Sequence, residues 1–144
     1  MPKQLLYQRL NKHPKHRWSM LRNMTASLFL HERIVTTDGK GKALLKVAHR
    51  MLARAVRDSK WSQDKVFGLL RVKDANYKLY IDLINRFRLS GGTFVRLLHN
   101  YRSRKGDGAN MVVVELLKKY IIFNLALIKK KKITNLKKYM IKSV

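Results

Sequence analysis

The apolar positions between residues 15 and 57 follow two helical stripes. Over residues 15–31, apolar side chains and one threonine recur at spacings of three and four, which is typical of one helix face. This face consists of Trp18, Leu21, Met24, Thr25 and Leu28. Thr36, Thr37 and Asp38 carry oxygen atoms suited to capping a second helix, and a longer stripe follows them. That stripe consists of Leu44, Val47, Ala48, Met51, Leu52, Ala55 and Val56.

Two more helices are predicted before Gly91-Gly92 interrupts the helical pattern. We expect Ser62 to cap a third, shorter helix bearing Val66, Leu69 and Leu70. We expect Asp74 to open a fourth helix. The predicted inward face of that fourth helix consists of Tyr77, Tyr80, Ile81, Ile84 and Phe87.

Short β-branched runs after the glycine pair predict strands at residues 93–98 and 111–116. The connection between them, residues 102–110, contains Gly106-Asp107-Gly108, which is a turn signal. An antiparallel pair packed against helices follows from this order, and Ile34-Val35 is a candidate third strand. The predicted fold class is therefore α+β, with four helices and a small antiparallel sheet in one domain over residues 15–117.

Charge divides the chain differently from hydrophobicity. The 144 residues carry 33 Lys and Arg against 8 Asp and Glu, a net charge of +25, although 46% of residues are hydrophobic. Residues 1–60 hold 14 basic and 3 acidic residues, residues 61–117 hold 10 and 5, and residues 118–144 hold nine lysines and no acid. We therefore expect an extended basic arm at residues 1–14, a core in the more balanced middle, and a lysine-rich extension at 118–144.

Few kinds of chemistry fit this composition. With no cysteine, the chain offers neither a disulfide framework nor a thiolate zinc site. The five histidines lack the clustered carboxylates of a metal site, and Gly39-Lys40-Gly41-Lys42 lacks the spacing of a nucleotide-binding loop. No apolar run is long enough to span a bilayer, and the N-terminus lacks the apolar stretch of a secretory signal. We predict no enzyme, cofactor, metal or small-molecule substrate.

A polyanion is the partner that this charge favours. Lysine and arginine neutralise phosphates and release their counterions, so nucleic acid would relieve the self-repulsion of a +25 chain. Trp18, Tyr77, Tyr80 and Phe87 fall at helical core spacing, so we do not expect them to stack on bases. In the extension, Ile121, Leu125 and Ile128 share one helix face, and we favour docking on a neighbour over binding to a membrane surface.

Several short motifs occur in an order that carries more information than composition. His-Glu-Arg-Ile-Val-Thr-Thr occupies residues 31–37, after Leu10-Asn11-Lys12, His16-Arg17 and Met-Leu-Arg-Asn-Met at 20–24. Lys42-Ala43, Lys78-Leu79, Gly91-Gly92-Thr93, Gly106-Asp107, Ala109, Met111 and Glu115-Leu116 follow. Over about residues 10–117 this order resembles the bacterial-type large-ribosomal-subunit protein seventeen family. The resemblance implies a helical domain with a small antiparallel sheet and no catalysis. It also implies partners: large-subunit ribosomal RNA (rRNA) and neighbouring large-subunit proteins near the polypeptide exit tunnel.

The sequence departs from the family pattern at several places. The family's dense N-terminal run of arginine, lysine and glycine is missing from residues 1–8, and Gly41-Lys42 replaces an Ala-Lys pair. An arginine pair expected near residues 63–65 is absent, and residues 118–144 have no family counterpart. These departures favour an organellar, mitochondrial ribosome, with another organelle or a bacterium as alternatives.

Three basic clusters are the candidate RNA-binding residues. The first cluster is Arg9, Lys12, Lys15, His16, Arg17, Arg22 and Asn23. The second cluster is Arg33, Thr36, Thr37, Lys40 and Lys42, where the amides of the second helix could also meet a phosphate. The third cluster is Arg96, Arg102, Arg104 and Lys105. The rival hypothesis is a free-standing DNA-compacting protein, which would need an even spread of basic residues.

Overall fold

The computed structural model describes residues 9–57, 59–88 and 92–117, with the backbone alone for residues 100–102. In chain order the elements are α1 (Pro14–His31), β1 (Arg33–Thr37), α2 (Asp38–Val56), α3 (Lys60–Leu69), α4 (Lys73–Lys78), η2 (Leu79–Leu83), α5 (Ile84–Phe87), β2 (Val95–Ser103) and β3 (Asn110–Leu116). Because α4, η2 and α5 are continuous, they form one helix with a π-helical turn inside it. The predicted α+β fold with four helices is confirmed, while residues 1–8 of the arm and all of the extension lie outside the described residues.

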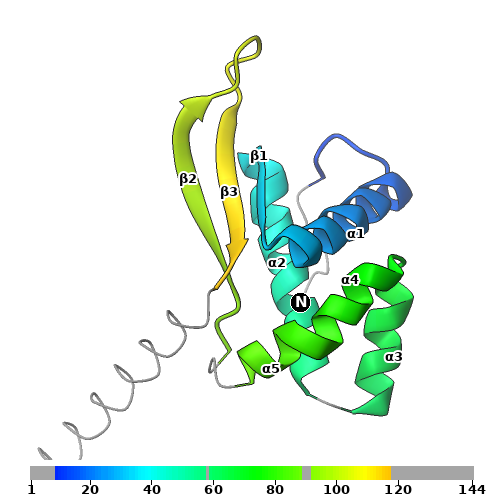
Figure 1. The fold of residues 1–144 in the computed structure, drawn as a ribbon. Helices are drawn as coiled ribbons and strands as arrows, with labels where there is room; N and C mark the ends of the chain where they lie inside the picture. The colour runs from blue at the N-terminus through cyan, green and yellow to red at the C-terminus, as the bar shows by residue number, and fades with distance from the viewer. Residues whose placement is uncertain (1–8, 58, 89–91, 118–144) are drawn as a thin grey trace, which may run out of the picture.

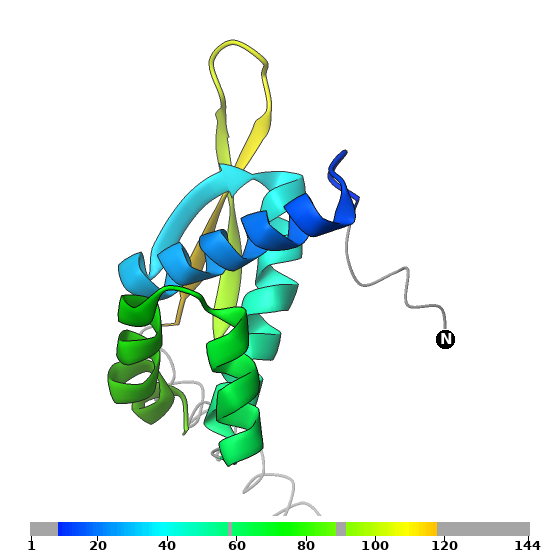
Figure 2. The ribbon, with the colours of Figure 1, turned by 90° about the vertical axis from the view of Figure 1, so that its right-hand side faces the viewer.

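The sheet is antiparallel, with strand order β1-β3-β2. The candidate third strand is therefore real, and it pairs Arg33 with Glu115 and Ile34 with Val114. Figures 1 and 2 show the helices gathered on one face of this sheet, while the β2–β3 hairpin projects beyond them. Since side chains alternate along a strand, one row of each strand faces the helices and the other row faces outward.

Helix α2 approaches the sheet most closely at Gly41. A Cβ atom built at this position would collide with Cγ2 of Val112 and lie 3.4 Å from Cδ1 of Leu97. Val112 is fully buried in the central strand and, being β-branched, has few rotamers to move into. Gly41, the second glycine of the Gly-Lys-Gly-Lys segment, therefore allows α2 to pack closely against the sheet, and phosphate binding is not needed to explain it.

The predicted face of α1 is largely buried. Leu21, Thr25 and Leu28 are inaccessible to solvent, whereas Trp18 and Met24 pack only partly against the core. Ahead of the helix, residues 9–13 form a turn instead of the expected extended arm. The Lys12 amide donates to the Arg9 carbonyl at 3.2 Å, and Leu10 and Asn11 have positive φ.

Helix α3 begins earlier than predicted. Ser59 is its N-cap residue, and its hydroxyl oxygen accepts a hydrogen bond from the Ser62 amide at 3.3 Å. The prediction that Ser62 is the cap was therefore wrong. Ser62 is buried and donates its hydroxyl proton to the Arg54 carbonyl at 2.6 Å, which ties α3 to the end of α2.

The fourth helix turns a different face inward from the one predicted. Tyr77 and Ile81 are 71% and 53% exposed, so their assignment to the core was wrong. Asp74 does not cap the helix but lies inside its first turn. Tyr80 is half-buried, and Ile84 and Phe87 are buried as expected. The other buried positions are Ala75, Asn76, Leu79 and Leu83. Ala75, Leu79, Leu83 and Phe87 recur every four residues and form the buried face of this helix. The large aromatic and aliphatic side chains alone did not predict that face.

The hairpin also differs in its length. Strand β3 agrees with the prediction to within one residue, but β2 continues to Ser103. The connection is therefore limited to residues 104–109, and the predicted loop 102–110 begins inside the strand. Glycines at 106 and 108 adopt positive φ in this turn, as their sequence signal predicted.

Candidate nucleic-acid interface

The start of α1 gathers most of the first cluster. The turn at residues 9–13 folds back on the helix, and Nη1 of Arg17 lies 3.5 Å from the Arg9 carbonyl. Pro14 opens the helix, no described side chain caps it, and its first turn contains no acid. The first turn of α1 therefore carries Lys15, His16 and Arg17 at the end of the helix where its dipole is positive. This end of α1 is well suited to an anion such as a phosphate.

Arg22 and Asn23 lie farther along the same helix. The Arg22 guanidinium stands 5.3 Å from the centre of the Trp18 ring, at cation–π distance. The Nε atom of Arg22 is buried and has no hydrogen-bond acceptor among the described residues. The Arg22 side chain is therefore less accessible to RNA than its inclusion in the first cluster predicted. Asn23 is exposed on the surface of α1.

The second cluster is divided between two environments. Thr36 is largely buried, with 9% of its surface exposed, so it offers little area to a phosphate. Lys42 forms an ion pair with Asp38 at 2.6 Å, and this acid occupies the first turn of α2. Since a carboxylate already sits at the positive end of the helix, the amides of α2 are a poorer phosphate site than those of α1. Lys40 and Thr37 are half-buried beside it.

The outer face of the sheet brings two clusters together. Arg33 on β1 and Arg96 on β2 both lie opposite Glu115 on the central strand. Arg96 forms an ion pair with Glu115, which neutralises part of its charge. Sequence spacing did not predict this juxtaposition, because 63 positions separate Arg33 from Arg96 and 19 separate Arg96 from Glu115.

The hairpin tip holds a second internal ion pair. Nε of Arg104 donates to Asp107 at 3.0 Å, and the Ala109 amide donates to the same carboxylate at 3.2 Å. These hydrogen bonds, the one from Arg104 first, lower the pKa of Asp107 from 3.8 to about 2. Lys105 is exposed beside the pair, while the Arg102 side chain lies outside the described atoms. The third cluster therefore carries less free charge than its composition indicated.

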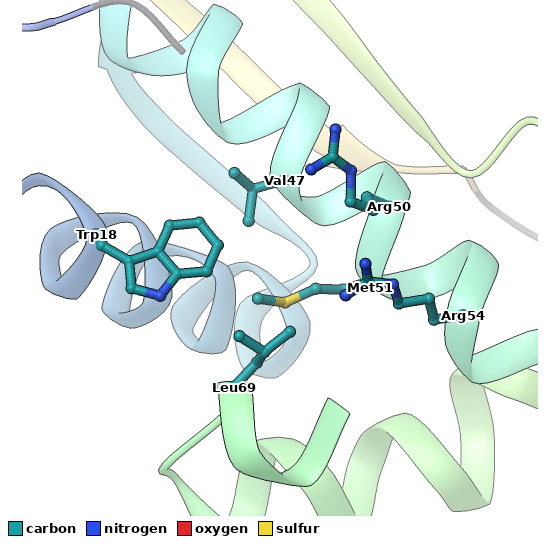
Figure 3. A pocket seen from close by; sticks show the side chains of 6 residues that line it. All are labelled: Trp18, Val47, Arg50, Met51, Arg54 and Leu69. Atoms are coloured by element: carbon teal, nitrogen blue, oxygen red, sulfur yellow. The ribbon is translucent and has the colours of Figure 1, made fainter. Parts of the chain in front are cut away.

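Helix α2 presents basic residues that were not among the candidates. Lys46, Arg50 and Arg54 recur every four residues, and Arg57 follows. Figure 3 shows Arg50 and Arg54 beside a hollow of about 230 Å³ between α1, α2 and the end of α3. Its wall also includes Trp18, Val47, Met51 and Leu69, and no acid. The i, i+4 spacing was the signal that could have identified this stripe.

The described residues contain no group of three or more His, Asp or Glu side chains arranged to hold a metal ion. His49 is engaged structurally, with Nε2 2.8 Å from the Gly92 carbonyl and its ring 5.0 Å from that of Phe94. None of the described helices is long and apolar enough to cross a membrane. The main chemical feature of the described residues is a surface rich in lysine and arginine.

Comparison with known proteins identifies the family. The family model described as "Ribosomal protein L17" matches residues 20–117. The chain belongs to the ribosomal protein L17 family. It is 36% identical over 109 residues to the large ribosomal subunit protein bL17 of Desulforapulum autotrophicum, covering 76% of this chain and 90% of that protein. It is 34% identical over 127 residues to bL17 of Lactobacillus helveticus, covering 78% of this chain and all of that protein.

The L17 match covers the three strands but begins inside α1. Five members of the first cluster, Arg9, Lys12, Lys15, His16 and Arg17, precede residue 20 and lie outside the matched segment. Support for these five comes from the acid-free helix end that gathers them. The basic stripe of α2 falls within the L17 match.

Proposed function

We propose that this chain binds large-subunit rRNA and stabilises its folded form near the polypeptide exit region of a mitochondrial ribosome. As an L17 family member it is a structural component of the large ribosomal subunit, with RNA and ribosomal proteins as partners. The exit-region location rests on the family resemblance. The mitochondrial assignment rests on the N-terminal departures and on the nine lysines of residues 118–144. A bacterial or other organellar ribosome remains the alternative.

The observation that carries RNA binding is the basic surface formed by the start of α1 and the stripe of α2. The positive helix end of α1 has Lys15 and Arg17 in its first turn, with His16 between them, and no acid to offset them. Arg50 and Arg54 continue this charge beside the hollow, whose wall is also free of acids. Phosphates supply the missing negative charge without demanding a particular base sequence.

The same features support a non-enzymatic role. The acids of the described residues are engaged in ion pairs at several key points, such as Glu32 with Arg86 and Asp107 with Arg104. The described residues contain no group of three or more His, Asp or Glu side chains that could hold a metal ion. Architectural binding needs only shape and charge, and the L17 membership agrees with it.

The salt dependence of rRNA binding tests this proposal. The slope of log K against log salt is negative, and each lost phosphate contact should reduce its magnitude by about 0.7 to 0.9. We expect Lys15→Gln and Arg54→Gln to show this reduction with a transcript of large-subunit rRNA. Arg104→Gln is the matched control, because Asp107 already neutralises that guanidinium. Unchanged slopes for the first two variants would contradict the assigned surface.

Two further measurements separate the rivals. If the chain compacts DNA, its affinity for duplex DNA should equal its affinity for rRNA, and most of it should sediment apart from ribosomal subunits. If it belongs to a mitochondrial ribosome, it should co-sediment with large subunits purified from mitochondria at moderate salt. Its recovery in another organelle's ribosomes, or in bacterial ones, would correct the location and leave RNA binding intact.

A further inference from the structure

The hollow between α1, α2 and the end of α3 has a wall of two chemical kinds. Its apolar part consists of Trp18, Val47, Met51 and Leu69, and its cationic part of Arg50 and Arg54. Figure 3 shows the indole of Trp18 on the α1 side and the two arginines on the α2 side. A phosphate alone does not require the apolar part, and an apolar side chain does not require two guanidinium groups. The hollow therefore suits a ligand that is apolar in one part and anionic in another.

The three helices around the hollow are strongly basic. Helices α1, α2 and α3 carry three, five and two lysines or arginines, and only two acids between them. Asp38, at the start of α2, pairs with Lys42 at 2.6 Å and lies nine residues before Val47. Asp64 on α3 is exposed, and its charge, after burial as the larger cause, raises the pKa of Tyr80 on the fourth helix. Neither acid belongs to the wall, so an anionic group that enters the hollow meets cations.

The volume of the hollow limits the size of the apolar part of its ligand. The hollow measures about 230 Å³. A cavity of about 150 Å³ accommodates a benzene ring, whereas drug-sized ligands occupy pockets of about 300 Å³ or more. One ring system of the size of a nucleobase therefore fits, and a nucleotide unites such a ring with a phosphate.

Trp18 offers the surface on which such a ring stacks. Its helical spacing led us to expect no stacking on bases, but the side chain packs only partly against the core and lines the hollow. Arg22 lies one turn later on α1, with its guanidinium 5.3 Å from the centre of the indole, and it does not belong to the wall. Arg22 therefore contacts the indole without filling the hollow. Aromatic side chains stack on all four bases, because every base has a π face.

We propose that the hollow receives one unpaired nucleobase of the bound rRNA, stacked on Trp18, while Arg50 and Arg54 bind the phosphates beside it. Folded RNA presents such bases in loops and bulges, where they are splayed out of the helix and stack on aromatic side chains. The inference rests on the proposed function and deepens it, because RNA contact at this place includes a base as well as the backbone. The contact selects an unpaired nucleotide but no particular base.

Binding of the full chain to a transcript of large-subunit rRNA, measured over a range of salt concentrations, tests the stacking. Loss of one base–aromatic stack should weaken binding about five- to 150-fold, and we expect this loss in Trp18→Leu. The salt slope of Trp18→Leu should be unchanged, because no phosphate contact is lost. Trp18→Phe keeps a ring and should retain most of the affinity. Arg54→Gln is the contrasting variant, since it should reduce the magnitude of the slope.

Tryptophan fluorescence observes the hollow without altering its wall. The chain has two tryptophans, and Trp61 is 68% exposed, so Trp61→Phe leaves Trp18 as the only reporter in a folded chain. We expect the rRNA transcript to quench Trp18 emission, because a stacked base contacts the indole. Leu69→Phe in the same background places a second ring inside the hollow. The transcript should then bind with an unchanged salt slope and leave Trp18 unquenched.

Full affinity of Trp18→Leu, an equal loss in Trp18→Phe, or quenching that is absent or that persists in Leu69→Phe would overturn base insertion. If urea titration shows that Trp18→Leu is unfolded, the fluorescence result decides alone. In each of these cases, reduced slopes for Lys15→Gln and Arg54→Gln would leave the proposed function standing. Unchanged slopes for those two variants, together with a quenched Trp18, would instead count against the phosphate contacts and leave the base contact standing.

Discussion

Glu32 joins three parts of the fold, and its loss should be costly. It ends α1 with positive φ, and its carbonyl accepts a hydrogen bond from the Leu116 amide at 2.9 Å. Its carboxylate accepts two hydrogen bonds from Arg86, at 2.7 and 3.0 Å, and lies 3.2 Å from Nζ of Lys78. The Arg86 hydrogen bonds first, with Lys78 and both positive charges, lower the pKa of Glu32 from 4.5 to about 2, against the opposing effect of burial.

This pKa sets the size of the effect. A pKa of about 2 in place of 4.5 corresponds to about 3 kcal/mol of stability at neutral pH. The Glu32 side chain is 32% exposed, so solvent screening reduces the expected value to about 2 kcal/mol. Because the folded-state pKa is depressed, this stability is fully present above about pH 5 and is lost as the pH falls through about 2.

The assay is urea unfolding of the full chain at several pH values. We expect Glu32→Gln to lower the free energy of unfolding by about 2 kcal/mol at pH 7 and by much less at pH 2, where the carboxylate is about half protonated in the folded wild type and almost fully protonated in the unfolded chain. Asp107→Asn is the control, because its ion pair with Arg104 lies on the exposed hairpin tip and should leave the midpoint unchanged. Equal stability of Glu32→Gln and wild type at pH 7, or a deficit independent of pH, would refute this reasoning.

Three further predictions concern packing and capping, each measured by urea unfolding. Gly41→Ala should destabilise by about 1 to 2 kcal/mol despite alanine's better helix propensity, because its Cβ collides with Val112. Combining it with Val112→Ala should cost less than the sum of the two changes. Ser59→Ala should cost about 1 kcal/mol through loss of the α3 cap. Asn76→Ala should cost about 1 to 3 kcal/mol, because the buried Leu70 carbonyl loses its 2.8 Å hydrogen bond.

Each of these has an outcome that would contradict it. A stabilised Gly41→Ala would mean that the alanine propensity outweighs the contact with the sheet. An unchanged midpoint for Ser59→Ala would show that the cap is replaced by water. For Asn76→Ala, the control Asn85→Ala removes an exposed amide that donates to the Ile81 carbonyl within one helix, and equal losses would show that burial is unimportant.

The failures of sequence reasoning share one physical cause. Apolar and aromatic content predicted Tyr77 and Ile81 as core, but the helix rotates to bury Leu79 and Leu83, which fit beneath the neighbouring helices. Capping chemistry placed the cap at Ser62, but a buried serine that bonds the Arg54 carbonyl is equally compatible with that sequence. Local sequence patterns indicate which residues are compatible with a buried or a capping position. Only tertiary packing decides which of them occupies it.

The candidate site shows the same division. Composition and charge distribution were enough to expect a polyanion partner, and motif order was enough to expect the L17 family, now shown. They could not show that Thr36 is buried, that Glu115 lies between Arg33 and Arg96, or that α2 adds its own basic stripe.

The sequence by itself determined which segments form helices and strands, the α+β class and the sign of the partner's charge. These depend on residue spacing and on net charge, which do not change with the arrangement of the elements. Only the tertiary structure decided which cations remain available and which aromatic rings face outward. Availability depends on neighbours distant in sequence, such as Glu115 for Arg96, and these come together only when the chain folds.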